Sequence, residues 1–329
     1  MAIPASTEHL LSASVLAAIG RLDLVARTVV EGFFIGLHKS PYHGLSQEFA
    51  EHRPYIAGDE IRRIDWRVYA RTDRLYVKES EEETNAPVRI LLDVSASLGY
   101  APRDLSKLDY ARFLAAALAY LATRQGDRVG LSCFNERIQA ALPARGGERH
   151  LQSILVALQQ QRASGQTRIG QTALSLASQW KRRGLAILIS DLYDESAEII
   201  DAVTRIRRVG HDVIVFHLLD SAERFLEKQS KRSAEKSSGR SVDQREDRLR
   251  EMSGTYEFHD LETGETLVAD IERVRKAYLE RLEETRATFR REFERAGADY
   301  CELDPSEPLD KALAMYLRRR KAGKSRGKR

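Results

Sequence analysis

Three polar residues, Asp93, Ser95 and Ser97, directly follow an apolar run, and their side chains are of the kinds that bind a hard cation. The stretch VRILLDVSAS from Val88 predicts a buried strand that ends in a polar loop. One carboxylate and two hydroxyls at alternate positions can face one point, and Mg²⁺ prefers oxygen ligands with some positions left to water. The same side chains could instead cap the next helix. The pattern thus favours a Mg²⁺ or Mn²⁺ site or a capping turn.

Two later segments are expected to bring further oxygen ligands to this loop. LAILISD is a second apolar strand that ends in an aspartate, Asp191. Because the carboxyl ends of parallel strands meet at one sheet edge, Asp191 should lie beside Asp93. Thr167 follows a glycine and precedes a predicted helix, so its hydroxyl could reach the same point, with Thr172 as the alternative. The predicted metal ligands are Asp93, Ser95, Ser97, Thr167 and Asp191.

The elements around these residues alternate between strands and helices, which is typical of a doubly wound α/β fold with a mostly parallel sheet. Apolar runs predict strands from 88, at 128–134, 185–191 and 211–218, a hairpin-like segment at 138–142, and a last strand at ADYCELD. Helical periodicity predicts helices at 107–124, 149–160, 170–183, 195–208 and 308–320, and a long amphipathic helix from 271 to 295 that packs on the sheet.

The chain of 329 residues is long enough for one large domain with attachments or for two domains. We assign 1–86 to an N-terminal helix and a small β subdomain of short strands and tight turns, and 87–320 to the α/β domain. Within that domain, 228–253 has few large apolar residues, so we expect a flexible insertion. Residues 321–329 are a basic tail.

Composition argues against several classes of protein. The net charge of +4 comes from the basic C-terminus, and no folded face with interleaved basic and aromatic residues predicts nucleic-acid binding. The longest uncharged run near the N-terminus, 10–20, is too short to span a bilayer and lacks a preceding basic cluster. Cys133 and Cys301 lie in apolar runs, which indicates buried thiols. We therefore expect a cytoplasmic protein with no membrane span.

The motifs also carry a family resemblance. Asp-x-Ser-x-Ser, a loop threonine and a later Ser-Asp resemble the metal-ion-dependent adhesion site of von Willebrand factor type A domains. The segment EFAEHRPYIAGDEIRRIDWRVYARTDRLYVKESEEET and the later YEFHDLETGE resemble the bacterial family called domain of unknown function 58. One departure is Arg168, since Asp or Asn commonly follows the threonine in that family. The resemblance implies a von Willebrand factor type A-like fold.

Similar proteins are commonly encoded beside AAA+ ATPases of the MoxR type, so the resemblance implies an adaptor between such an ATPase and an unknown protein client. We expect a non-catalytic binding module, in which neutral hydroxyls leave the cation short of negative charge and a partner carboxylate completes its shell. Two alternatives remain. One is a metal-independent scaffold. The other is a phosphoryl-transfer enzyme with Asp93 as nucleophile, but Ser95 stands where such enzymes have an acid–base aspartate.

Overall fold

A six-stranded sheet forms the centre of the computed structural model, which describes residues 21–39, 52–55, 66–78, 87–102, 105–225, 227–228, 250–251 and 254–326. The strand order is β12-β7-β6-β3-β4-β5, and every neighbouring pair is parallel except β4 with the edge strand β5. The predicted α/β class with a mostly parallel sheet is confirmed. The strands are β3 (Val88–Asp93), β4 (Val129–Phe134), β5 (Ile138–Arg145), β6 (Leu185–Ser190), β7 (Asp212–Leu218) and β12 (Asp299–Leu303).

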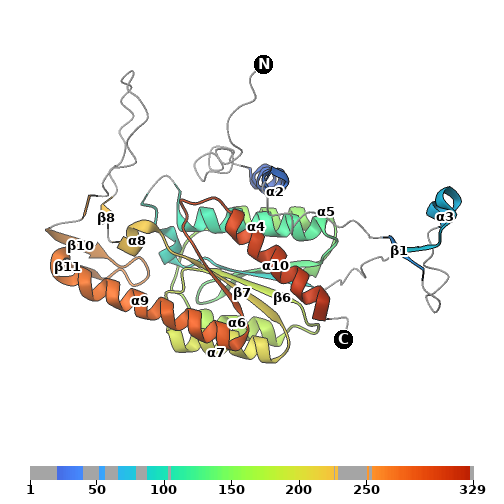
Figure 1. The fold of residues 1–329 in the computed structure, drawn as a ribbon. Coiled ribbons are helices and arrows are strands. Elements are labelled where there is room, and N and C mark those ends of the chain that lie inside the picture. The colour runs from blue at the N-terminus through green and yellow to red at the C-terminus, as the bar shows by residue number, and fades with distance from the viewer. Residues whose placement is uncertain are drawn as a thin grey trace, which may run out of the picture.

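Helices cover both faces of this sheet (Figure 1). Side chains alternate between the faces along each strand, so Ile90 and Leu92 enter one core and Leu91 enters the other. The first core also contains residues of α2 (Leu22–Lys39), α4 (Lys107–Arg124), α5 (Glu148–Gln160) and α10 (Asp310–Arg326). The second contains residues of α6 (Ile169–Ser178), α7 (Ser196–Arg208) and α9 (Ile271–Ala296).

The N-terminal region differs in part from expectation. Short strands occur as expected, but β1 (His52–Pro54) pairs with β2 (Tyr76–Lys78), a pairing that we did not predict, and Trp66–Thr72 forms helix α3 where we expected only strands and turns. Contacts at helical spacing explain α3, because the Trp66 and Tyr69 rings meet edge to face at 6.0 Å. Helix α2 supplies buried residues to the core of the sheet domain, so this part of the expected N-terminal unit packs with the sheet.

Several predicted boundaries also move. Helix α6 ends at Ser178, five residues earlier than expected, whereas α10 continues to Arg326. Most of the expected insertion at 228–253 lies outside the described residues, and its described ends pair as β8 (Glu227–Lys228) and β9 (Arg250–Glu251). A hairpin of β10 (Thr255–His259) and β11 (Thr266–Asp270) then leads directly into α9. The small helices α8 (Ser221–Phe225) and η3 (Ala96–Gly99) complete the described elements.

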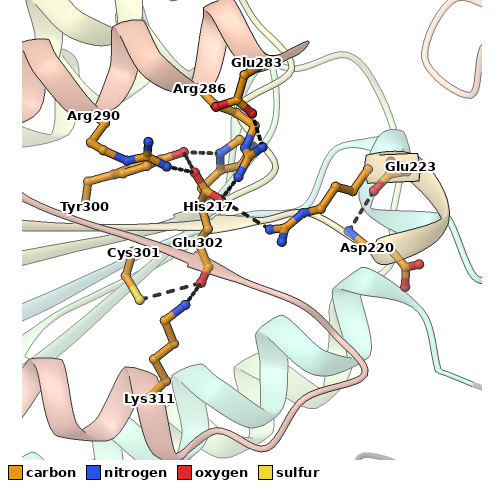
Figure 2. Close-up of polar contacts among 11 residues, drawn as sticks. His217, Asp220, Glu223, Glu283, Arg286, Arg290, Tyr300, Cys301, Glu302 and Lys311 are labelled. Carbon is orange, nitrogen blue, oxygen red and sulfur yellow. Dashed lines mark hydrogen bonds and ion pairs between the residues drawn. The ribbon is translucent and has the colours of Figure 1, made fainter. Parts of the chain in front are cut away.

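Helix α9 is fixed to the sheet edge by a charged cluster around Glu302 of β12 (Figure 2). The Glu302 carboxylate accepts hydrogen bonds from Arg286 and, at 3.0 Å, from Arg290, both on α9. Arg224 of α8 donates to the same carboxylate at 3.2 Å. The cluster therefore joins the C-terminal half of α9 to the edge strand and to helix α8.

Two composition-based expectations can be compared with the described residues. Cys133 and Cys301 are both buried free thiols, as predicted. Within the described ranges, we find no helix with the length and apolar character needed to cross a bilayer.

His217 gives the fold a specific acid sensitivity. It is buried at the end of β7, its Nδ1 lies 2.6 Å from the Tyr300 hydroxyl, and burial lowers its pKa to about 4. The folded state therefore binds a proton at His217 more weakly than the unfolded chain does. The stability of the fold is unaffected by His217 above pH 6.5, and it falls as the pH is lowered toward 4, because the unfolded chain takes up the proton first.

We predict that His217→Gln reduces the loss of unfolding free energy between pH 7.5 and 4.5 by roughly 2 kcal/mol, because glutamine stays neutral throughout. Urea unfolding across this pH range measures the effect. His259→Gln on the exposed face of the hairpin serves as the control and should keep the wild-type slope. A His217→Gln slope equal to that of the wild type would contradict the prediction.

Candidate metal centre

Asp93 lies where strand β3 ends, between β4 and β6, which is the point where the strand order changes direction. Its side chain is fully buried, and both carboxylate oxygens accept hydrogen bonds. Oδ1 accepts from the Ser95 backbone amide at 2.9 Å, and Oδ2 accepts from the Ser190 hydroxyl at 2.6 Å. Asp93 thus connects its own loop to the end of strand β6.

The two predicted carboxylates do interact. Burial and the negative charge of Asp191 raise the pKa of Asp93 well above its usual range, although the bonds from Ser190 and Ser95 oppose this rise. Asp191 is buried as well, and among the described residues its Oδ1 has no hydrogen-bond partner. An unpaired buried carboxylate oxygen is costly. Its presence beside a second carboxylate is the feature that a bound cation would relieve.

The two serine hydroxyls are hydrogen-bonded to each other, with Ser95 Oγ and Ser97 Oγ 3.0 Å apart, which is also a spacing that neighbouring metal ligands can have. Adjacent ligands of an octahedral Mg²⁺, each about 2.1 Å from the ion, lie about 3 Å from each other. Of the capping alternative, Asp93 does accept from the amide of Ser95, the N-cap residue of η3, but the Ser95 side chain makes no capping bond, so capping accounts for Asp93 and not for the Ser95 hydroxyl.

Thr167 is held in a loop that is bonded to the loops of the two aspartates. The Ser164 amide donates to the Val94 carbonyl at 3.0 Å, and the Ala96 amide donates to Gly165 at 2.9 Å. On the other side, the Ile169 amide donates to Asp194 of the β6–α7 loop at 2.7 Å. The three predicted segments therefore converge at one sheet edge.

The threonine itself is engaged by a residue that we did not predict. The Thr167 hydroxyl donates to Glu262 Oε1 at 2.6 Å, and its amide donates to Oε2 at 3.0 Å. Thr172, the alternative ligand, lies within helix α6 and is buried. Arg168, the departure from the family pattern, is exposed. Its side chain is therefore not buried against the predicted ligands.

Lys107 is the second residue that sequence reasoning missed. Its ammonium group is buried and lies 2.6 Å from Asp191 Oδ2 and 2.8 Å from Glu223 Oε1. Burial opposes the charge, but these two carboxylates dominate and raise the pKa of Lys107. A lysine in the first turn of a helix opposes the helix dipole, and this was the available signal. Ser190 and Glu262 lie in the quoted motifs Ser-Asp and YEFHDLETGE but were not predicted to contact the site, and no signal in the sequence indicated Glu223.

The charges and donor atoms fit a divalent cation. If Asp93, Asp191 and Glu223 are all ionised, they carry three negative charges and the Lys107 ammonium balances one of them, so a net charge of −2 remains. The donor set is hard oxygen throughout, which suits Mg²⁺ or Mn²⁺. Within the described residues no group of three His, Cys, Asp or Glu side chains is arranged to hold a metal. The candidate centre instead combines two carboxylates with hydroxyls.

Lys107 should be essential for stability. We predict that Lys107→Met lowers the free energy of unfolding by about 3 to 5 kcal/mol, because it leaves Asp191 and Glu223 buried without a counter-charge. Lys276→Met, which removes an exposed lysine from helix α9, should change stability by about 0.5 kcal/mol or less. Chemical denaturation measures both, and equal stability of the two variants would contradict the assigned role.

Comparisons with known proteins agree with the motifs. The model for the family described as "Protein of unknown function DUF58" matches residues 51–251, a range that contains all five predicted ligands. Uncharacterized proteins of Mycobacterium tuberculosis and Mycobacterium bovis are 30% identical over 211 residues, which is 62% of this chain. The match spans 65% of the length of those curated relatives.

Solved structures that resemble the chain share little sequence with it. An aerotolerance-related membrane protein from Bacteroides fragilis is 17% identical, with 71% of this chain and 99% of that chain covered and a TM-score of 0.42. BatB from Bacteroides thetaiotaomicron is 16% identical, with 71% and 98% covered and a TM-score of 0.44. The von Willebrand factor type A domain of SpRpn10 is 12% identical, with 40% and 75% covered and a TM-score of 0.33. On the family match, the chain is a member of the DUF58 family.

Proposed function

We propose that this protein is a non-catalytic binding module that uses Mg²⁺ or Mn²⁺ to capture a carboxylate of a partner protein. The observation that carries the proposal is the buried pairing of Asp93 with Asp191, whose Oδ1 lacks a hydrogen-bond partner among the described residues. Asp93, Ser95, Ser97, Thr167 and Asp191 would hold the ion. When bound, the ion supplies positive charge to an incoming carboxylate.

The surrounding residues support binding rather than catalysis. Asp93 is fully buried and both of its oxygens already accept hydrogen bonds, so it is poorly placed to attack a substrate. Ser95 stands at the position where an acid–base carboxylate would be needed and cannot replace it. These features argue against the phosphoryl-transfer alternative.

The metal-independent scaffold keeps one observation in its favour. Lys107 already pairs with Asp191 and neutralises part of the buried charge. However, the ammonium group makes no hydrogen bond to Asp93 and reaches Asp191 only at Oδ2. The scaffold therefore leaves the second oxygen of Asp191 unexplained, and the metal-dependent module is the better account.

The proposed partners are a MoxR-type AAA+ ATPase and an unknown protein client. The family resemblance suggests the ATPase, and the sequence offers no phosphate-binding loop, so energy for remodelling must come from another protein. The cytoplasm is the proposed location, which the two buried free thiols support.

We predict one binding site for Mg²⁺ or Mn²⁺ that Asp93→Ala abolishes. Isothermal titration calorimetry and the Mn²⁺ electron paramagnetic resonance signal measure it. Asp201→Ala, which removes an exposed aspartate of helix α7, should bind the ion as the wild type does. Affinity can be as weak as millimolar, since few of the direct ligands are charged. Equal binding by both variants would reject the site.

We also predict that a MoxR-type ATPase co-purifies with this protein in Mg²⁺. Chelation by EDTA or the substitution Asp93→Ala should reduce the retained ATPase, because the metal connects the two proteins. Asp201→Ala should retain it. If the ATPase is retained equally with EDTA and with Asp93→Ala, the metal-independent scaffold is favoured. If the ATPase does not associate at all, it is not a partner.

A further inference from the structure

The β10–β11 hairpin brings a carboxylate of this chain to the candidate metal centre. Glu262 at its tip receives hydrogen bonds from both the hydroxyl and the amide of Thr167, at 2.6 and 3.0 Å. Thr167 is a predicted metal ligand, and it lies 95 residues before Glu262 in the chain. The hairpin itself follows the segment that the family model matches.

The turn that carries Glu262 is built to hold it in place. The Asp260 carboxylate accepts hydrogen bonds from the amides of Glu262, at 2.7 Å, and Thr263, at 3.2 Å. These bonds lower the pKa of Asp260. The Gly264 amide donates to the Asp260 carbonyl, and Gly264 has φ +74°, a conformation that favours glycine. Glu262 is therefore presented by a defined turn.

Core packing does not explain why the tip lies at this site. Leu261, Leu267 and Val268 keep 52%, 65% and 64% of their surface exposed, and Tyr256 and Phe258 are only half-buried. The base is fixed instead, because Ile271 is buried at the start of α9 and its amide donates to Gly254. The hairpin thus has an anchored base and a tip held by polar contact with Thr167.

We propose that Glu262 is an internal carboxylate ligand of the metal centre and occupies the position that a partner's carboxylate takes. The Thr167 hydroxyl gives its proton to Glu262, so its lone pairs remain available to a cation. Thr167 Oγ1 and Glu262 Oε1 are 2.6 Å apart, so both oxygens are close enough to reach one ion once this hydrogen bond lengthens toward the spacing of about 3 Å between octahedral ligands.

The charge of Glu262 also suits this role. The hydroxyl ligands are neutral, so a nearby carboxylate supplies the negative charge that the ion lacks. A partner that binds through its own carboxylate must first displace Glu262. The hairpin therefore makes the centre self-blocking, and this inference rests on the proposed metal-dependent function.

The test measures Mn²⁺ affinity and the number of Mn²⁺-bound waters by proton relaxation in the full chain. The variants are Glu262→Ala, the isosteric Glu262→Gln, and Glu265→Ala as a control with an exposed side chain in the same turn. Glu262→Ala should weaken Mn²⁺ binding about tenfold and add a bound water, because a charged ligand is lost, whereas Glu262→Gln should weaken binding without adding a water, because its amide oxygen can still coordinate. Glu265→Ala should match the wild type.

Acetate provides the second measurement, because it is a free carboxylate. Millimolar acetate should remove the added water from Glu262→Ala and leave the wild type and Glu265→Ala unchanged. If Mn²⁺ binding needs Asp93 but is the same in the wild type, both Glu262 variants and Glu265→Ala, then Glu262 is not a ligand and the proposed function stands. Glu262 is also rejected as a ligand, with the proposed function intact, if acetate acts equally on the wild type and Glu262→Ala. If Mn²⁺ binding does not need Asp93, both proposals fail.

Discussion

Buried negative charge at the carboxyl ends of β3 and β6 is the constraint on which the rest of this structure depends. Asp93 and Asp191 are both almost inaccessible to solvent, and the charge on one raises the pKa of the other. Such a pair is unfavourable unless cations or hydrogen-bond donors compensate it. The molecule supplies donors to Asp93 from Ser95 and Ser190 and supplies one buried ammonium to Asp191.

That requirement explains the construction of the surrounding elements. Helix α4 is an alanine-rich core helix, yet its first residue is Lys107, whose charge is held between Asp191 and Glu223 and lies near the rings of Tyr100 and Tyr193. A lysine there is unfavourable for the helix dipole but favourable for the site. Leu192, which directly follows Asp191, has φ 56°, a left-handed conformation that is strained for leucine, so the backbone beside the candidate centre is strained.

The β10–β11 hairpin is held at both of its ends. Ile271 is buried where the hairpin enters α9 and its amide donates to the Gly254 carbonyl, which fixes the base. Thr167 holds Glu262 at the tip. The contacts at the base do not pass through Thr167 or Glu262, so a displaced tip would leave the base in place. This separation suits the proposal that Glu262 is an exchangeable ligand.

The sequence by itself determined the elements that depend on local pattern. Apolar runs that end in Asp93 and Asp191 located two parallel strands, and the periodicity of 107–124 matched helix α4 at both ends. The sequence pattern did not predict α3, because this helix has too few residues to show helical periodicity. The pattern also placed the end of α6 five residues too late. Local pattern therefore located the predicted ligands and left boundaries imprecise.

Only the tertiary structure decided how the charges of the site are balanced. Lys107 meets Asp191 across 84 residues, and Thr167 meets Glu262 across 95. No local periodicity relates such positions, because their contact depends on strand order, on the helix that covers the sheet and on the path of a hairpin after the insertion. The sequence thus specified which oxygen-bearing side chains lie at the sheet edge, whereas the fold determined that the Lys107 ammonium and the Glu262 carboxylate lie beside them.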